Sequence, residues 1–378
     1  MWLGMAAIPF LYVLARLVLP LQAGWKVKLA WGTLLFAVAF KFHILRLFAG
    51  PRFFAPELPG WVQALTSWLF VSFFLMIFLL FFADLARFAM WAVRRAVLRL
   101  PAWPRARSVG NAVNLVLLVL ASILAARGMA NALRLPEVRR VEAVLPNLPA
   151  ELEGTTVALL ADLHADMLTR ESDIAETVRR TNALDPDLVV LAGDYADGTV
   201  EKLSRKLAPL GTLRSRYGVF AVPGNHEYYS GYREWLDFLS SLGITVLENS
   251  SRKILPRLHV AGITDPAALR RGEAAPDLDA ALADIPAEAF TILLAHQLRD
   301  TEAAAARGVG MQLSGHTHGG MIPGFDRIVA AFNRGFVAGE YRVGPMFLYV
   351  SRGAFLWRGF PVRLGVPSEI VLLTLRRG

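Results

Sequence analysis

The sequence predicts an N-terminal region of four transmembrane helices followed by an α/β domain. Hydrophobic residues make up 55% of the 378 residues, and long apolar segments are concentrated in the first third of the chain. From Thr155 onward, short apolar runs alternate with helical patterns, which is typical of α/β domains. We therefore divide the chain into a transmembrane region (1–130), a linker with a first strand (131–150) and an α/β domain (151–378).

The predicted membrane region rests on four apolar segments, each close to the roughly 20 residues that a helix needs to cross a bilayer. They are Trp2–Leu21, Val27–Phe48, Leu65–Val93 and Val109–Ala126. No Lys or Arg precedes the first segment and no small-x-small pattern follows it, so we do not interpret it as a signal peptide. In the second segment, Lys41, His43 and Arg46 fall in the last turns, where they are expected to reach the interface.

Basic residues near the segment ends predict the orientation. The loop between the third and fourth segments contains Arg94, Arg95, Arg99, Arg105 and Arg107. The positive-inside rule places this loop in the cytoplasm, together with the loop that contains Lys26 and Lys28. The α/β domain is then extracytoplasmic, on a multi-pass protein of a bacterial inner or cell membrane. Four arginines after the fourth segment oppose this orientation: Arg127, Arg134, Arg139 and Arg140.

Composition limits the other functional classes. The chain has no cysteine, which excludes disulfides, thiolate metal sites and cysteine nucleophiles. The net charge of +9 is compatible with nucleic-acid binding, but the apolar segments favour the lipid bilayer as the partner. We expect no nucleic-acid partner, and the sequence gives no indication of the oligomeric state. Arg16, Lys41, Asp84 and Arg87 are interpreted as anchors. Clustering of Arg16 with Asp84 inside the helical bundle would reopen the alternative of a transporter or channel with a regulatory soluble domain.

The α/β domain contains eight predicted strands separated by helical patterns. The strand segments are "TVALLAD", "DLVVLAGD", "GVFAVPGN", "LHVAGITD", "FTILLAH", "GVGMQLSGH", "MFLYVSRG" and "EIVLLTL". Helical patterns such as "ESDIAETVRRTNAL" and "YREWLDFLSSL" lie between them. In open α/β sheets, ligands bind in the crevice beyond the carboxyl ends of the strands. Polar residues at these ends are therefore candidate site residues.

Five predicted strands end in polar residues of this kind. The residues are Asp162 and His164, Asp194, Asn225 and His226, His296, and His316 and His318. Residues i and i+2 of an extended chain point to one side, which predicts that Asp162 projects with His164 and His316 with His318. Gly193, Gly224, Gly315, Gly319 and Gly320 are predicted to allow sharp turns and close approach of a ligand.

This residue set predicts a centre of two metal ions. Two aspartates, one asparagine and four histidines suffice for two ions if one aspartate bridges them, and mixed imidazole and carboxylate ligands suit Mn, Fe or Zn. A lone histidine at a strand end is usually only a hydrogen-bonded side chain, but five of the seven histidines lie at such ends. For the other two, His43 and His259, we favour a structural role. Asp197 is expected to hold its loop by hydrogen bonds.

The ordered motifs D-x-H, G-D-x-x-D, G-N-H-E, H and G-H-T-H resemble those of the calcineurin-like metallophosphoesterase superfamily, over roughly residues 136–378. The resemblance implies an α/β/β/α sandwich of two mixed sheets. It also implies one metal held by Asp162, His164, Asp194 and His318, and a second held by Asp194, Asn225, His296 and His316. Asp194 would bridge the two metals. His226 would contact the phosphate or protonate the leaving group.

The extended G-H-T-H-G-G signature is similar to that of a branch of membrane-anchored and exported phosphodiesterases. Met321 stands where that branch usually has glutamine, and Phe355–Trp357 is bulkier than its pattern. We expect hydrolysis of a phosphodiester or pyrophosphate bond in a membrane lipid or envelope precursor. Arg352, Phe355 and Trp357 are the candidate substrate contacts, in a tail rich in aromatic and arginine residues. The alternatives are a soluble phosphate substrate and a metal-bound scaffold or regulatory domain without catalysis.

Overall fold

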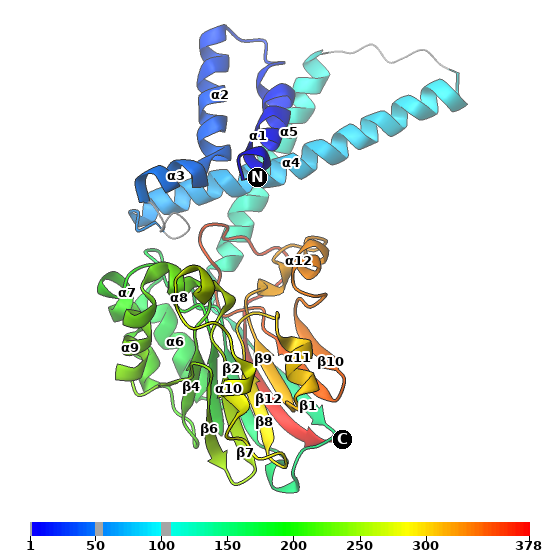
Figure 1. Cartoon of the computed structure of the whole chain (residues 1–378). Coiled ribbons are helices and arrows are strands. Elements are labelled where there is room, and N and C mark those ends of the chain that lie inside the picture. Colours follow the sequence, from blue (N-terminus) through cyan, green and yellow to red (C-terminus); the bar gives the residue numbers. More distant parts are fainter. Residues whose placement is uncertain (1, 50–55, 100–106) are drawn as a thin grey trace. The chain divides into compact units, whose positions relative to one another are not determined.

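The computed structural model describes residues 2–49, 56–99 and 107–378, and the chain divides into two compact units (Figure 1). The N-terminal unit comprises Met1–Phe54 and Pro59–Ala130. The C-terminal unit comprises Asn131–Gly378 together with the short segment Ala55–Leu58. Arg105, one of the arginines in the predicted basic loop, lies outside the described residues.

The described residues of the N-terminal unit form helices joined by short turns, with no strand. Its helices are α1 (Trp2–Val13), which continues as a π-helical turn (Leu14–Val18), α2 (Trp25–Ala39), α3 (Lys41–Ala49), α4 (Gly60–Ala92) and α5 (Arg107–Ala132). Within the described residues, two helices are long and apolar enough to cross a membrane, Gly60–Val97 and Gly110–Ala132. The pair α2 and α3 would add a third span if the two helices together form one broken span.

The structure therefore supports two or three of the four predicted spans. The first apolar segment forms a helix that ends before Pro20, and its apolar part, Ala6–Val18, would be about 20 Å long at about 1.5 Å per residue. That is shorter than the roughly 30 Å of a hydrocarbon core. The second segment bends by 70° after Phe40, where the polar residues Lys41, His43 and Arg46 begin the amphipathic helix α3. Hydrophobicity alone did not reveal either break.

The C-terminal unit contains two six-stranded sheets. The first has the order β1 (Glu137–Leu145), β12 (Glu369–Arg377), β2 (Thr156–Leu160), β3 (Leu188–Ala192), β4 (Val219–Val222) and β5 (Thr245–Val246). The second has the order β10 (Gly339–Val343), β11 (Met346–Val350), β9 (Met311–Ser314), β8 (Phe290–Leu294), β7 (Leu258–Gly262) and β6 (Ser250–Leu255). All eight predicted strands are present, and the short strands β5, β6 and β10 were not predicted.

Both sheets are mixed. In the first, β2, β3, β4 and β5 are parallel, β12 runs antiparallel to β2, and β1 runs parallel to β12. In the second, β7, β8, β9 and β11 are parallel, with the antiparallel strands β6 and β10 at its edges. The carboxyl ends of the parallel strands meet at one edge of each sheet, where the candidate site residues follow.

The sheets pack face to face around a shared core, with helices on the outer faces. Alternate residues of β2 lie in different cores: Val157 and Leu159 lie in the core that also contains Ile292 and Leu313 of the second sheet, while Ala158 and Leu160 lie in the core shared with the outer helices. Those helices are α6 (Glu171–Asn182), α7 (Val200–Leu207) and α9 (Tyr232–Ser241) on the first sheet, and α10 (Leu278–Leu282) and α11 (Thr301–Ala306) on the second. This confirms the predicted α/β/β/α layers (Figure 1).

Candidate metal centre

The candidate ligands follow the carboxyl ends of five parallel strands. Asp162 and His164 follow β2, Asp194 follows β3, Asn225 follows β4, His296 follows β8, and His316 and His318 follow β9. Backbone hydrogen bonds join the loop after β2 to the loop after β3, from the Asp162 amide to the Gly193 carbonyl (3.0 Å) and from the His164 amide to the Asp194 carbonyl (3.0 Å). Because β2, β3 and β4 belong to the first sheet and β8 and β9 to the second, both sheets contribute candidate ligands.

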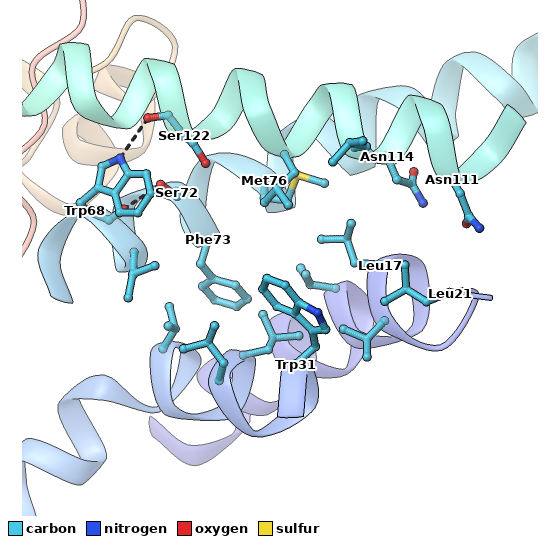
Figure 2. A pocket seen from close by; sticks show the side chains of 18 residues that line it. Leu17, Leu21, Trp31, Trp68, Ser72, Phe73, Met76, Asn111, Asn114 and Ser122 are labelled. Carbon is cyan, nitrogen blue, oxygen red and sulfur yellow. Dashed lines mark hydrogen bonds between the residues drawn. The ribbon is translucent and has the colours of Figure 1, made fainter. Parts of the chain in front are cut away.

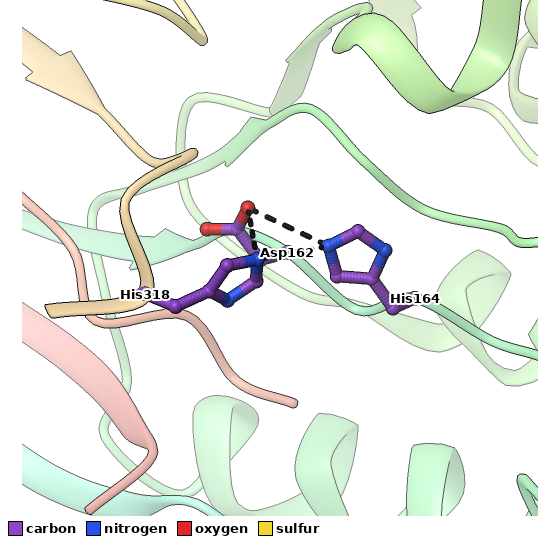
Figure 3. Close-up of side chains that lie close together, drawn as sticks. All are labelled: Asp162, His164 and His318. Carbon is purple, nitrogen blue, oxygen red and sulfur yellow. Dashed lines mark hydrogen bonds and ion pairs between the residues drawn. The ribbon is translucent and has the colours of Figure 1, made fainter. Parts of the chain in front are cut away.

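One group of ligands consists of Asp162, His164 and His318 (Figure 3). The Nε2 atoms of His164 and His318 lie 3.2 Å apart, and they lie 3.8 Å and 3.7 Å from Oδ1 of Asp162. All three residues are buried. These three donor atoms all lie within 4.8 Å of one another, close enough to hold one metal ion together.

A second group consists of Asp194, His296 and His316. Nε2 of His296 lies 3.1 Å from Oδ2 of Asp194, and the rings of His296 and His316 are 5.2 Å apart. The same Oδ2 of Asp194 lies 3.6 Å from Nε2 of His164 in the first group. Asp194 thus lies between the two groups, as the bridging position implied by the family resemblance requires.

Five of these positions have a left-handed backbone. The φ angles are +55° at Asp162, +42° at His164, +58° at Asp194, +74° at His316 and +50° at His318. Residues other than glycine adopt this conformation rarely and at a cost, and such residues cluster at functional sites. Asp162 and His164 do belong to one ligand group, whereas His316 and His318 belong to different groups. The assumption of an extended chain is wrong, because these residues lie in tight left-handed turns beyond the strands, which strand periodicity does not reveal.

Two glycines are required because the ligand carboxylates approach them closely. A Cβ atom on Gly224 would lie 2.2 Å from Oδ1 of Asp194, and one on Gly315 would lie 2.5 Å from Oδ2 of Asp162. Gly319 and Gly320 were predicted to make room for a ligand. Their Cβ positions are instead filled by Val366, Arg352 and Asp326, so the chain itself packs against them.

Asp197 connects the first group of ligands to His226. Its Oδ1 lies 3.2 Å from Nδ1 of His164 and 2.5 Å from Nδ1 of His226. Its amide also donates to the Ala165 carbonyl (2.7 Å), so its loop is held as expected. Because both Nδ1 atoms face a carboxylate, they carry the protons, and both Nε2 atoms are directed toward the ligand cluster. The sequence did not indicate this double role.

Glu227 is a buried site residue that our sequence interpretation did not identify. Its carboxylate accepts hydrogen bonds from the amides of Gly224 (2.8 Å), Asp194 (3.1 Å) and Tyr195 (2.7 Å). It thereby ties the loop after β4 to the loop that carries Asp194. The available signal was its place three residues after Gly224 at the start of α8 (Asn225–Ser230), where a glutamate typically accepts from the first amides of a helix.

Burial and the mutual charges of the site shift its pKa values. Burial raises the pKa of Asp194, but the neighbouring His296 and His226 outweigh burial and hold it well below the ordinary value. Burial lowers the pKa of His226, but the carboxylates of Asp194 and Asp197 outweigh it and raise this pKa to about 9. Burial, followed by the charge of His296, lowers the pKa of His316 to about 3. Asp194 therefore stays ionised and His316 stays neutral, as ligands must.

The donor atoms fit divalent metal ions. Nδ1 of His296 donates to the Ala192 carbonyl (2.7 Å), which directs its Nε2 at the Asp194 carboxylate, 3.1 Å away. Burial lowers the pKa of His296, but the charge of Asp194 outweighs it and raises this pKa well above the ordinary value, so Nε2 carries a proton that a metal ion would displace. Nε2 of His164, whose Nδ1 faces Asp197, presents a lone pair to His318 and to both carboxylates. Oδ1 of Asn225 is buried without a hydrogen-bond partner. Converging lone pairs repel one another unless a cation lies between them, and this mixed N and O set suits Mn, Fe or Zn.

Comparison with known proteins agrees with this geometry. Residues 155–320 match the family model described as calcineurin-like phosphoesterase. The chain is 37% identical over 266 residues to an uncharacterized metallophosphoesterase of Campylobacter jejuni, covering 69% of each chain. This chain belongs to the metallophosphoesterase family. It is therefore a metal-dependent phosphoesterase, and the resemblance stated from the motifs is confirmed.

Two further comparisons concern the architecture of this metallophosphoesterase. It is 34% identical over 293 residues to a Danio rerio protein named transmembrane protein with metallophosphoesterase domain, covering 72% of this chain and 66% of that one. This relative and the apolar helices α4 and α5 suggest a membrane protein. A solved dimetal phosphatase from Danio rerio aligns with 53% of this chain and 88% of its own, with a TM-score of 0.37 and 14% identity.

The structure separates the three candidate substrate contacts of the metallophosphoesterase. The ring of Trp357 lies 6.1 Å from that of His226, beside the ligand groups. The side chain of Arg352 is 28% exposed, with its Nε 3.9 Å from Glu369. Phe355 is 2% exposed and packs in the core between the first sheet and its helices. Phe355 is therefore a packing residue, because its aromatic ring fills the core and does not face the site.

Two arginines of the aromatic tail are also buried. Arg363 donates to several carbonyls of the loops around it, including those of Arg352 (2.6 Å) and Phe355 (2.7 Å). Arg358 lies 3.9 Å from Asp166 and is 3% exposed. These side chains hold the loops around the site. His43 and His259 belong to none of the ligand groups among the described residues.

Proposed function

We propose that this metallophosphoesterase hydrolyses a phosphodiester or pyrophosphate bond in a membrane lipid or envelope precursor. The observation that carries the chemistry is the convergence of nitrogen and oxygen donors from six residues in two adjacent groups beside His226, next to the buried and unpartnered Oδ1 of Asn225. Two divalent ions, Mn, Fe or Zn, held there would lower the pKa of a water nucleophile and stabilise charge on the phosphoryl oxygens. The chain itself would contribute the donor atoms that position the ions, and His226 would contribute a proton.

Each ligand group has a proposed role. Asp162, His164 and His318 would hold one ion, Asn225, His296 and His316 would hold the other, and Asp194 would contribute to both. The support for the bridging role is that Oδ2 of Asp194 lies 3.6 Å from Nε2 of His164 and 3.1 Å from Nε2 of His296. Asp194 also forms a third group with His164 and His226, and no other described carboxylate belongs to two groups. Asp194→Asn should therefore lower the content of both metals, as measured by elemental analysis.

His226 is proposed to protonate the oxygen of the leaving group. Its Nδ1 is paired with Asp197, and its Nε2 lies 3.9 Å from Oδ2 of Asp194, facing the space between the ligands. A positively charged imidazole in this position also attracts the phosphate. General acid catalysis by a histidine typically contributes about 10²–10⁴-fold to the rate.

The test of this role is His226→Gln in the full chain, assayed with a chromogenic phosphodiester. The rate should fall by about 10²-fold or more while the metal content stays at two ions per chain. His259→Gln is the matched control, because His259 is a buried histidine of β7 outside the ligand groups. Normal turnover by His226→Gln would remove this residue from the mechanism.

The lipid substrate is supported by the apolar helices and by the surroundings of His226. Two helices of the N-terminal unit are long and apolar enough to cross a membrane. Trp357 presents an aromatic surface beside His226, and Arg352 provides a partly exposed guanidinium on the adjoining loop. An aromatic ring and an arginine are suited to the chain and the phosphate of a lipid. Trp357 and Arg352 are therefore the proposed substrate contacts.

A substrate comparison tests the lipid proposal. The full chain in nanodiscs should cleave a prenyl pyrophosphate or a phospholipid with a higher kcat/KM than a nucleotide pyrophosphate of the same bond type. Trp357→Ala should raise KM for the lipid several-fold and leave a small chromogenic diester nearly unaffected. Phe332→Ala is the control, because Phe332 is an aromatic residue of α12 (Asp326–Phe332) with 85% exposure. Equal kcat/KM values for lipid and soluble substrates would favour the soluble alternative.

The extracytoplasmic side is proposed for the catalytic unit because the substrate class includes envelope precursors. The chain has no cysteine, so a single cysteine introduced at the exposed Glu201 of α7 reports its location. A membrane-impermeant maleimide should label Glu201→Cys in intact spheroplasts. Labelling only after lysis would place the unit in the cytoplasm.

A further inference from the structure

The N-terminal unit contains an apolar cavity of about 290 Å³ between its helices (Figure 2). Residues of α1 and its π-helical turn, α2, α4 and α5 line it, and most of them are leucine, valine, phenylalanine, methionine or tryptophan. In Figure 2, Trp68 lies at one end of the cavity and Asn111 and Asn114 lie at the other. The rings of Trp31 and Phe73 line the part between these ends. All lining residues belong to the same compact unit.

The volume of this cavity is large enough for a ligand and larger than an ordinary packing defect. Natural cores have few voids larger than a water molecule. An engineered apolar cavity of about 150 Å³ stays dry and binds benzene. A cavity of about twice that volume accommodates on the order of twelve carbon atoms on the same scale. Such a length of hydrocarbon matches the larger part of one lipid chain.

The asparagine end of the cavity carries an unused hydrogen-bond acceptor. Asn114 is 7% exposed, and its Nδ2 donates to the carbonyl of Arg16 (2.7 Å). Its Oδ1 is buried and has no hydrogen-bond partner. Leaving a buried polar atom unpaired costs on the order of 1–3 kcal/mol. A hydroxyl group of a bound lipid would satisfy this atom.

Next to this end lies a cationic cluster formed by Arg16, Asp84 and Arg87. Arg16 and Arg87 both pair with Oδ1 of Asp84, and Tyr12 donates to Oδ2 of the same carboxylate (2.9 Å). Two guanidinium groups share one carboxylate, so one positive charge has no counter-charge within the cluster. Nε of Arg16 is buried without a partner, while each arginine side chain is about one third exposed. The cluster is therefore accessible and needs an anion.

The cavity and the cluster meet at the π-helical turn Leu14–Val18. Val13 and Leu17 line the cavity, and Arg16, the neighbour of Leu17 in this turn, belongs to the cluster. Asn114 lines the cavity and bonds to the backbone of Arg16. An amphiphile can thus place its chain in the cavity and its charged group at the arginines. An unpaired charge is costly near a bilayer, and guanidinium groups bind phosphate well.

We propose that the N-terminal unit binds one phospholipid with an anionic phosphate headgroup, with one acyl chain in the cavity and the phosphate at Arg16 and Arg87. The contact between Arg16 and Asp84, which would favour a polar function of this region, thus forms part of a lipid site. This site is separate from the metal centre and does not depend on the proposed substrate. Its occupation is measured by binding, so a failure of the catalytic proposal leaves it unaffected.

The experiment uses the full chain purified in detergent and supplied with an equimolar amount of phosphatidylglycerol or of phosphatidylcholine with the same acyl chains. Native mass spectrometry should show one phosphatidylglycerol retained per chain and several-fold less phosphatidylcholine. Leu118→Trp, which fills the cavity from α5, should lose the lipid. Leu120→Trp is the matched control, because Leu120 lies on the same helix, is 40% exposed and does not line the cavity.

Arg87→Gln tests the headgroup separately. It should lower the retention of phosphatidylglycerol to that of phosphatidylcholine. A second measurement covers the case in which Leu118→Trp fails to fold: brominated acyl chains should quench the fluorescence of Trp31, so the quenched fraction should fall in Trp31→Phe. Retention of lipid by a folded Leu118→Trp, equal retention of both lipids, or an unchanged quenched fraction in Trp31→Phe would each overturn the proposal.

Discussion

Replacing Gly224 with alanine tests how tightly the chain positions its bridging carboxylate. A Cβ atom at this position would lie 2.2 Å from Oδ1 and 2.5 Å from the amide nitrogen of Asp194. Ordinary van der Waals contacts of a Cβ atom begin at 3.4 Å, so the carboxylate or the loop after β4 must move by about 1 Å. Misplacement of a catalytic group by about 1 Å can cost about 10²-fold in rate.

Gly224→Ala should therefore lower kcat/KM for a chromogenic phosphodiester by about 10²-fold, and it should also lower the metal content. Gly211→Ala is the matched control, because a Cβ atom there would lie 3.2 Å from the flexible end of the Leu242 side chain and at ordinary contact distances, 3.4 Å or more, from its Cβ and carbonyl oxygen. Circular dichroism and thermal unfolding would show that both variants fold. A folded Gly224→Ala with normal rate and normal metal content would refute the reasoning.

Three further predictions follow from the same site. Asp197→Ala removes the acceptor shared by His164 and His226, so metal affinity should fall by about 10–100-fold and the turnover rate should fall further. Titration calorimetry measures the affinity, and a turnover assay measures the rate. An unchanged affinity would show that Asp197 does not orient His164. Burial raises the pKa of Asp265 to about 6, so the folded chain binds the proton of this carboxyl group more tightly than the unfolded chain does. The free energy of unfolding should therefore fall by up to about 3 kcal/mol as pH rises from about 4 to about 6. Asp265→Asn should flatten this part of the stability profile, whereas parallel melting curves for variant and parent across that pH range would contradict the assignment. Removal of metal by a chelator should lower the melting temperature, because a ligand present at about 100 times its Kd stabilises the folded protein by about 2.7 kcal/mol. Addition of Mn, Fe or Zn in turn should restore the melting temperature. A melting temperature that the chelator leaves unchanged would show that the ligand groups hold no metal.

The strands of the α/β domain could be predicted from the sequence because both faces of each strand are buried. β2, β3 and β8 consist almost wholly of apolar residues, since one face packs in the core between the sheets and the other packs against helices. The polar residues at the strand ends interrupt these runs sharply. That contrast between apolar strand and polar strand end is what indicates the position of the site.

The membrane region shows the limit of the same reasoning. Hydrophobicity identified the apolar segments, but it did not show that α1 stops before Pro20 or that the second segment bends after Phe40. Both breaks depend on local backbone geometry. Likewise, Phe355 was a plausible substrate contact by residue type, but its ring lies in the core.

The sequence by itself determined the family, the layers of the α/β domain and the residues that can act as metal ligands. These properties depend on residue type and order along the chain. Only the tertiary structure decided that Asp197 pairs with both His164 and His226, and that Glu227 joins two loops. The physical reason is that these contacts join loops from different strands through left-handed turns, whose geometry is set by the packing of the two sheets and leaves no periodic pattern in the sequence.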